Sequence, residues 1–164
     1  MKKKIFAVVI LILICMSTYA QRLDQNYTTA LGVKVWGQAE AGISLKHFLP
    51  TKNHALEGIG YFWYHGVRFT GLYEFHFDFY EAPGLKWYVG PGAHLGFYND
   101  NYRDQYVDNG REGAFVGIDG VLGLDYKFKN APINISLDWQ PSIEFGTING
   151  FQAGWGGFGM RYTF

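Results

Sequence analysis

Histidine, serine and acidic side chains are the residues of this 164-residue chain that could carry out nucleophilic chemistry. Such chemistry needs a nucleophile, a base and an acid that orients the base. The candidate bases are His76 and His94, and the candidate nucleophiles are Ser136 and Ser142. The orienting acid could be any of three residues: Glu74, Asp138 and Glu144. Their spacing matches no motif of a lipid-processing enzyme, so the catalytic set is a hypothesis that no sequence motif supports.

The N-terminal residues have the three parts of a secretory signal peptide. Lys2 to Lys4 form a basic segment, residues 5–16 are apolar without a break, and residues 17–20 supply small side chains for cleavage. This apolar run is too short for a transmembrane helix, which needs about 20 residues. We therefore expect residues 1–20 to be a signal peptide and residues 21–164 to be the mature domain.

The composition argues against several kinds of chemistry. Cys15, the one cysteine, lies in the expected signal peptide, so the mature chain has no disulfide, thiolate metal ligand or cysteine nucleophile. After cleavage, eleven basic side chains stand against fourteen acidic ones. This balance gives no electrostatic footprint for nucleic acid. We expect no metal and no cofactor.

The mature chain alternates between apolar and polar side chains in eight segments, as β-strands with one apolar face do. Turn residues such as Pro50, Pro83 and Pro132 separate several of them. The third segment is largely apolar on both faces, so its inward face stays open. The segments fall at about residues 29–39, 43–49, 55–64, 67–79, 87–98, 116–128, 133–140 and 151–164.

The fourth and the last segments separate their two faces most cleanly. In residues 67–79, the face with Phe69 and Phe75 carries no charge, whereas the opposite face carries Arg68 and Asp78. A soluble β-sandwich would also alternate, with its apolar face inside. A membrane barrel instead turns that face to lipid, where a basic side chain near the midplane costs about 2–4 kcal/mol. The last segment ends on an aromatic residue, and its apolar face is Phe158, Met160, Tyr162 and Phe164.

The expected signal peptide, the glycine-rich alternating segments and the ending Gly-Phe-Gly-Met-Arg-Tyr-Thr-Phe resemble the small eight-stranded outer-membrane barrels of the OmpA/OmpX type, as found in Bacteroidota. The resemblance implies an all-β fold, an antiparallel up-and-down transmembrane barrel in the outer membrane of a Gram-negative bacterium. It implies lipid and lipopolysaccharide as surroundings, and the barrel assembly machinery as a partner of the C-terminal strand. It says little about activity, because this architecture hosts structural proteins, adhesins and lipid-modifying enzymes.

The lumen of an eight-stranded barrel is just wide enough for side chains to fill it. We expect acids and bases to neutralise each other there, because an unpaired buried charge is very costly. A filled lumen argues against a wide pore and favours a non-enzymatic barrel that serves envelope integrity or surface interaction. The expected polar network is Lys34, Arg68, Glu74, Asp78, Asp119, Asp125, Asp138 and Arg161, with His76, His94 and Lys127 on the same faces.

Two prolines keep a lipid-modifying enzyme as the alternative. Pro91 and Pro141 fall inside the predicted fifth and seventh strands, which flank the sixth. Proline removes a ladder donor and is normally confined to edges or bulges, and a closed barrel has no edge. Either the ladder is open there and admits a lipid tail from the side, or each proline marks a bulge or strand end. In the first case His76, His94 and Ser136 are the candidate residues for acyl chemistry on lipid A or a phospholipid.

The longest polar stretch, residues 99–113, is expected to be an outer surface loop, with the short turns and both termini on the periplasmic side. It lacks the ordered ligand spacing of a known calcium loop. Its exposed tyrosines and mixed charges could contact an extracellular partner or lipopolysaccharide sugars. These residues are Asp100, Tyr102, Arg103, Asp104, Tyr106 and Asp108.

Overall fold

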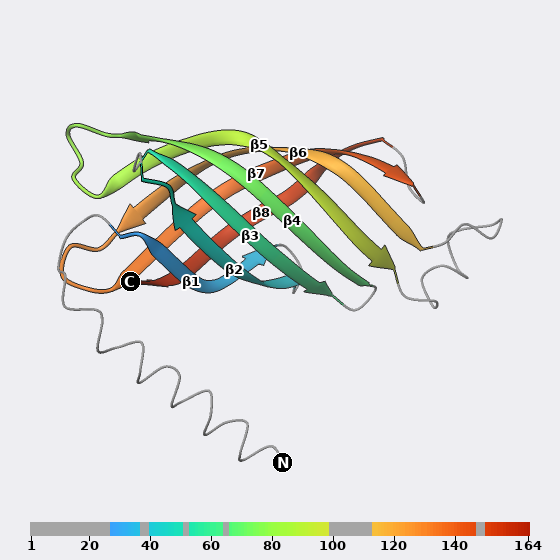
Figure 1. Cartoon of the computed structure of the whole chain (residues 1–164), viewed down its shortest axis with the longest axis horizontal. Coiled ribbons are helices and arrows are strands. Elements are labelled where there is room, and N and C mark those ends of the chain that lie inside the picture. The colour runs from blue at the N-terminus through green and yellow to red at the C-terminus, as the bar shows by residue number, and fades with distance from the viewer. Residues whose placement is uncertain (1–26, 37–39, 51–52, 64–65, 99–112, 147–149) are drawn as a thin grey trace, which may run out of the picture.

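The chain folds into one closed barrel of eight antiparallel strands that follow each other in sequence order (Figure 1). The computed structural model describes residues 27–36, 40–50, 53–63, 66–98, 113–146 and 150–164. Their strands are β1 (Thr29–Trp36), β2 (Glu40–Phe48), β3 (His54–Trp63), β4 (Gly66–Asp78), β5 (Leu85–Tyr98), β6 (Ala114–Lys127), β7 (Ile133–Gly146) and β8 (Gly150–Thr163). The expected eight-stranded up-and-down barrel is therefore confirmed. The expected signal peptide and the six loop residues named above lie outside the described residues.

The two ends of the barrel differ. At the end called here the turn end, the chain finishes beside the first strand, where the Thr29 amide donates to the Phe164 carbonyl over 2.9 Å. The expected turn at residues 81–84 lies at the same end, and its Gly84 has a φ of 91°, which favours glycine. The opposite end, where β5 finishes at Tyr98, is called the loop end. None of the described residues forms a helix long and apolar enough to cross a membrane.

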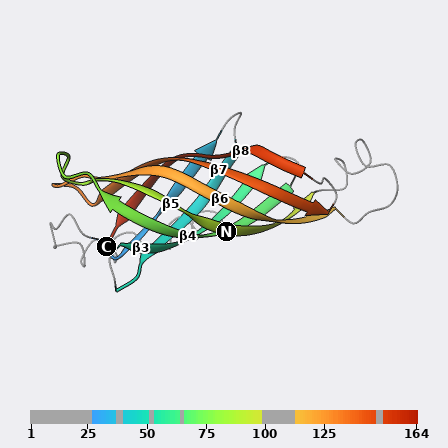
Figure 2. The same ribbon diagram turned by 90° about the horizontal axis from the view of Figure 1, so that it is seen from above.

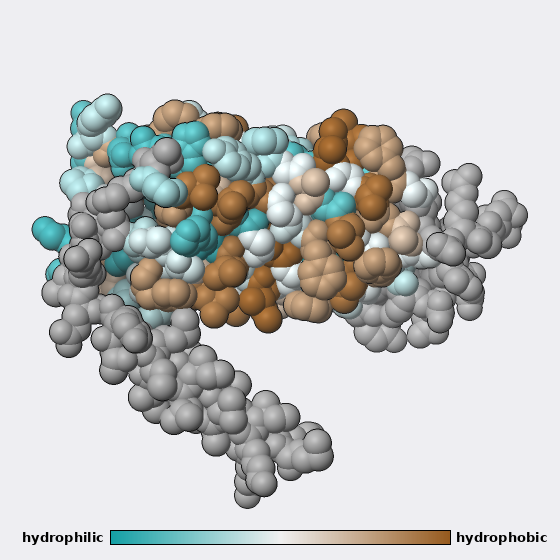
Figure 3. Space-filling view, in the orientation of Figure 1, coloured by the Kyte–Doolittle hydropathy of each residue, from teal (hydrophilic) through white to brown (hydrophobic). Residues whose placement is uncertain are grey.

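Strand periodicity sets which side chains enter the barrel. Along β4, Arg68, Leu72 and Glu74 are buried in the lumen, whereas Phe69 and Phe75 are exposed on the outer wall. The structure also shows which face of the third strand points into the lumen, a question that the sequence left undecided. The inward side chains are Ala55, Glu57, Ile59 and Tyr61. Figure 3 shows apolar side chains gathered along the barrel wall and hydrophilic ones concentrated towards the turn end.

The strand pairs of the barrel differ in length. Figure 2 shows strands on opposite sides of the barrel crossing one another at a strong tilt. The β5–β6 pair runs over thirteen residue pairs, from Leu85–Tyr126 to Phe97–Ala114. Among the described residues, the β1–β8 seam that closes the barrel has six, from Ala30–Thr163 to Val35–Phe158. The first strand runs from Thr29 to Trp36, and the rest of its expected range, residues 37–39, lies outside the described residues. The seventh strand continues past Pro141 to Gly146 and is longer than expected.

Both prolines interrupt the hydrogen-bonded ladder, but in different ways. Beside Pro91, the pairing of β4 with β5 jumps from Leu72–Gly92 to Phe75–Val89. Beside Pro141, the pairing of β6 with β7 jumps from Asp119–Ser142 to Leu122–Trp139, and the β7–β8 register shifts between Gln140 and Ser142. The β5–β6 ladder continues through Pro91 without a gap. The sixth strand is thus interrupted on its β7 side, and the bulge-like register shift at Pro141 lies on the opposite side of β7, against β8.

Candidate functional site in the barrel lumen

The lumen holds two groups of polar side chains with an apolar layer between them. The layer consists of Ile59, Tyr61, Leu72, Tyr88 and Val121. On the side nearer the turn end lies the turn-end cluster: Lys34, Ser44, Lys46, Glu57, Glu74, His76, Asp125, Asn134, Ser136, Asp138 and Arg161. On the other side lies the loop-end cluster: Arg68, Thr70, His94, Asp119 and Glu144. Tyr88 reaches from the layer into the first cluster.

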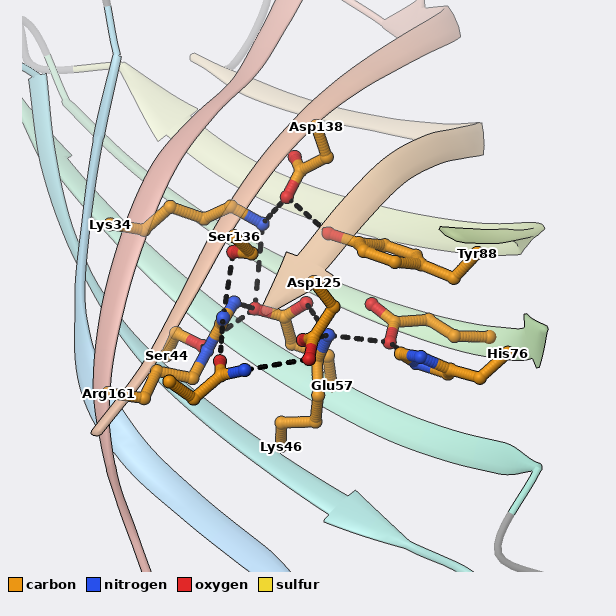
Figure 4. Close-up of polar contacts among 12 residues, drawn as sticks. Lys34, Ser44, Lys46, Glu57, His76, Tyr88, Asp125, Ser136, Asp138 and Arg161 are labelled. Carbon is orange, nitrogen blue, oxygen red and sulfur yellow. Dashed lines mark hydrogen bonds and ion pairs between the residues drawn. The ribbon is translucent and has the colours of Figure 1, made fainter. Parts of the chain in front are cut away.

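Arg161 is the centre of the turn-end cluster and connects four strands (Figure 4). Its guanidinium forms an ion pair with Glu57 of β3 and donates to Ser44 of β2 over 2.6 Å. It also donates to Ser136 of β7 over 2.8 Å. Because both charged partners are fully buried, losing either would leave an uncompensated ion inside the protein.

Two lysines extend this cluster. The Lys34 ammonium lies 2.6 Å from Asp138, whose carboxylate also accepts the Tyr88 hydroxyl over 2.7 Å. The Lys46 ammonium lies 2.8 Å from Glu74 and 3.4 Å from Asp125, and 4.3 Å from the centre of the Tyr88 ring. Each buried ammonium therefore has a carboxylate at hydrogen-bonding distance, as a low-dielectric interior requires.

Tyr27 and His76 close the turn end of this cluster. The Tyr27 hydroxyl, just before β1, donates to the Asp125 carboxylate at 3.3 Å. Burial, followed by the charge of Asp125, raises the pKa of Tyr27, so this hydroxyl keeps its proton and remains a donor. The His76 ring stacks on Tyr88 at 4.9 Å between centroids, and its Nε2 lies 2.8 Å from Glu74.

The loop-end cluster is built around Arg68. Its guanidinium pairs with Asp119 and donates to Glu144 over 3.3 Å and to Thr70 over 3.1 Å. The guanidinium carbon also lies 4.1 Å from the centre of the Trp155 ring, which is a cation–π distance. All three guanidinium nitrogens of this buried cation thus have side-chain partners, on β4 itself and across the lumen on β6 and β7.

His94 joins this cluster from the fifth strand. Its Nδ1 lies 2.9 Å from Asp119 and 3.0 Å from an Arg68 nitrogen, and its Nε2 lies 3.7 Å from Glu144. Gly117 makes room for the ring, since a Cβ there would collide with His94 and with the Ile143 carbonyl. The imidazole consequently lies across β6 between two carboxylates.

Most of the predicted lumen residues are brought together, but into two separate groups. Asp78 lies instead at the end of β4, where its side chain is 60 % exposed and pairs with Lys86 at 3.2 Å. Lys127 is at the lumen mouth and donates to the Phe128 and Ala131 carbonyls over 2.8 and 2.7 Å. Position along the strand explains both, because alternation fixes the face of a side chain but not its depth.

The predicted catalytic residues do not form one site. His76 contacts Glu74, Ser136 is bonded to Arg161, and His94 lies in the other cluster beside Asp119. Sequence reasoning missed Glu57, the main partner of Arg161, because both faces of its strand are largely apolar. The register gives the signal that could have found it: Lys46 and Glu57 are directly opposite on β2 and β3.

The C-terminal apolar residues point away from both clusters. Phe158, Met160 and Phe164 are exposed on the outer wall, on the face opposite Arg161. Within the described part of the chain, no group of three or more His, Cys, Asp or Glu side chains is arranged so that it could hold a metal ion. Comparisons with protein-family models, curated proteins and solved structures find no match. Evidence about function therefore comes from the lumen and the outer wall of the barrel.

Proposed function

We propose that this chain is an integral outer-membrane β-barrel of a Gram-negative bacterium, of the OmpA/OmpX type, which serves envelope integrity or surface interaction without catalysis. The observation that carries the proposal is the polarity of the wall. The fully buried side chains include Lys34, Lys46, Arg68 and Arg161, whereas large apolar side chains such as Ile118 and Leu137 are each 57 % exposed. Water would favour the reverse arrangement, and lipid favours this one.

The two polar clusters support a structural role rather than a conducting one. Ion pairs and the apolar layer around Tyr61 and Leu72 fill the lumen between the two ends. We propose lipid and lipopolysaccharide as the contacts of the outer wall, and the barrel assembly machinery as the partner that receives β8. An extracellular partner would meet the segment 99–113, which carries the tyrosines and mixed charges named above.

Expression of the whole chain in a Gram-negative host tests the location. We expect a mature protein that begins at Gln21, sediments with outer membranes and resists extraction by alkaline carbonate. It should also migrate differently on an SDS gel before and after heating, because a closed barrel withstands the detergent until it is heated. N-terminal sequencing and membrane fractionation provide the readouts. A soluble periplasmic protein with the same cleaved start would contradict the membrane location while leaving the signal peptide intact.

A lipid-modifying enzyme is the second candidate, favoured by the place where the ladder is interrupted. His94 and Asp119 form an imidazole–carboxylate pair, and Ser142 is opposite Asp119 in the last pair before the gap near Pro141. The Ser142 Oγ is buried and has no hydrogen-bond partner among the described residues. On the outer wall, a groove of about 480 Å³ adjoins the other interruption and is lined by Gly58, Gly71 and Pro91 among others.

Mass spectrometry of outer-membrane lipids distinguishes the two candidates. If the barrel is an enzyme, cells with the wild-type protein should show a defined change in lipid A or phospholipid acylation. Ser142→Ala and His94→Gln should abolish this change while the folded protein remains abundant. Ser136→Ala is the matched control, since Ser136 is held by Arg161. We expect no lipid change with any of the four proteins, as a non-enzymatic barrel requires.

A further inference from the structure

The loop-end cluster contains one positive charge fewer than its carboxylates need. Arg68 is its permanent cation, and Asp119 and Glu144 are its two acids, with side chains between 0 and 3 % exposed. His94 contacts both acids, through Nδ1 at 2.9 Å and Nε2 at 3.7 Å. An extra negative charge at this depth would be costly. One proton shared among His94 and the two carboxyls makes the described cluster neutral.

The turn-end cluster has the same deficit. Lys34, Lys46 and Arg161 are its permanent cations, and its four acids are Glu57, Glu74, Asp125 and Asp138. The two other nearby cations have partners at the mouth: Lys86 pairs with exposed Asp78, and Lys127 is held by backbone carbonyls. One proton again restores neutrality among the described residues.

Glu74 and His76 are the pair best placed to hold that proton. His76 Nε2 lies 2.8 Å from one Glu74 oxygen, and the cation nearest to Glu74 is Lys46, which is shared with Asp125 and Glu57. The surrounding rings of Phe48 and Tyr88 lie 4.8 and 4.9 Å from the His76 ring and exclude water. Glu57, by contrast, has Arg161 and Lys34 as direct partners.

We propose that each lumen cluster is a proton-binding site: Glu74 with His76 holds one proton, and His94 with Glu144 and Asp119 holds the other. The polar core is electrically neutral with both protons bound. The inference concerns the closed barrel itself and goes beyond its proposed role in the envelope. It makes the barrel sensitive to alkaline conditions, because loss of either proton leaves a buried carboxylate without a counter-ion.

The sign of the pH dependence follows from linkage. The folded barrel retains protons that the unfolded chain releases as the pH rises, so stability falls with rising pH. Each retained proton changes the folding equilibrium constant by about tenfold per pH unit once the unfolded groups have lost theirs. For a barrel whose lumen holds two such protons, the folding equilibrium constant should fall by about a hundredfold per pH unit in that range.

Isosteric amides test the assignment in the turn-end cluster. Glu74→Gln replaces a neutral carboxyl by a neutral amide that can still donate to His76, so the folding equilibrium constant should change by less than about tenfold. Glu57→Gln removes an ionised partner of Arg161 and should cost more than a hundredfold. The measurement is urea unfolding of the full mature barrel in detergent micelles, followed by tryptophan fluorescence from neutral to alkaline pH.

The slope of the unfolding free energy against pH is the readout that a merely structural role of these residues would not change. Glu74→Gln and Glu144→Gln should each reduce the slope by one proton, and the double variant should lose both. Glu81→Gln, an exposed carboxyl in the turn after β4, is the control and should leave the slope unchanged. Wild-type slopes in the single variants, or an equal cost for Glu74→Gln and Glu57→Gln, would overturn the proposal. If Glu74→Gln fails to fold, Glu144→Gln tests the other site by the same slope.

Discussion

Replacing Arg161 by methionine should lower the free energy of unfolding of the barrel by about 3–5 kcal/mol, the usual cost of removing one partner of a buried ion pair. The substitution leaves the Glu57 carboxylate without its closest cation and removes the donors to Ser44 and Ser136. Methionine keeps much of the length of the side chain, so most of the loss should be electrostatic. Urea unfolding of the barrel in detergent micelles would measure it.

The double variant Arg161→Met, Glu57→Gln is the matched control. It removes both charges, and Lys34 and Lys46 keep Asp138 and Asp125 as charged partners. Much of the lost stability should therefore return, because paired charges cost less to remove together than singly. A loss below about 1 kcal/mol for Arg161→Met alone, the range of exposed ion pairs, would show that water reaches this part of the lumen.

Placing an arginine on the outer wall gives the second large effect. Leu122 is 50 % exposed near the middle of β6, so Leu122→Arg should lower the stability of the barrel in lipid vesicles by about 2–4 kcal/mol. The cost arises because a charged side chain near the bilayer midplane loses its hydration. Denaturant unfolding in vesicles, with the tryptophans as probes, measures the difference.

Phe128→Arg controls for the change of side chain. Phe128 is also exposed on the outside, but it lies just beyond the end of β6, where an arginine should cost about 0–1 kcal/mol. A large difference between the two variants supports a wall immersed in lipid. Equal and small effects would mean that this wall faces water, and the outer-membrane proposal would then fail.

The strand pattern could be predicted wherever one face carried charge. β4 shows this best, since Arg68 and Glu74 identify the lumen side and Phe69 and Phe75 the outer side. On β3 both faces are largely apolar, so the inward position of Glu57 could not be established before the register with Lys46 was known. On the seventh strand the alternation could be followed only to residue 140, whereas the strand continues through Pro141 to Gly146, because a bulge can accommodate a proline that an unbroken ladder would exclude.

The division of the lumen into two clusters was not predictable from alternation. Alternation gives the direction of a side chain, whereas the partner depends on the shear of the barrel and on residues far away in sequence. Arg161 and Glu57 are 104 positions apart, and Lys46 and Asp125 are 79 apart. The expectation that buried charges would be paired held because of the cost of burial, although the pairs themselves could not be read from the sequence.

The short β1–β8 seam is the last strand pairing that can form. Its six residue pairs join the two ends of the chain, and Arg161, which connects β8 to Ser44 at a separation of 117 residues, is the fourth residue from the C-terminus. Seven strands can pair with their sequence neighbours as they emerge, but the cylinder has no closing strand until the last residues have been delivered. Until then β1 presents an unpaired edge and the lumen charges lack their central counter-ion. The strand edge that closes the barrel is therefore the one whose two partners are farthest apart along the described chain.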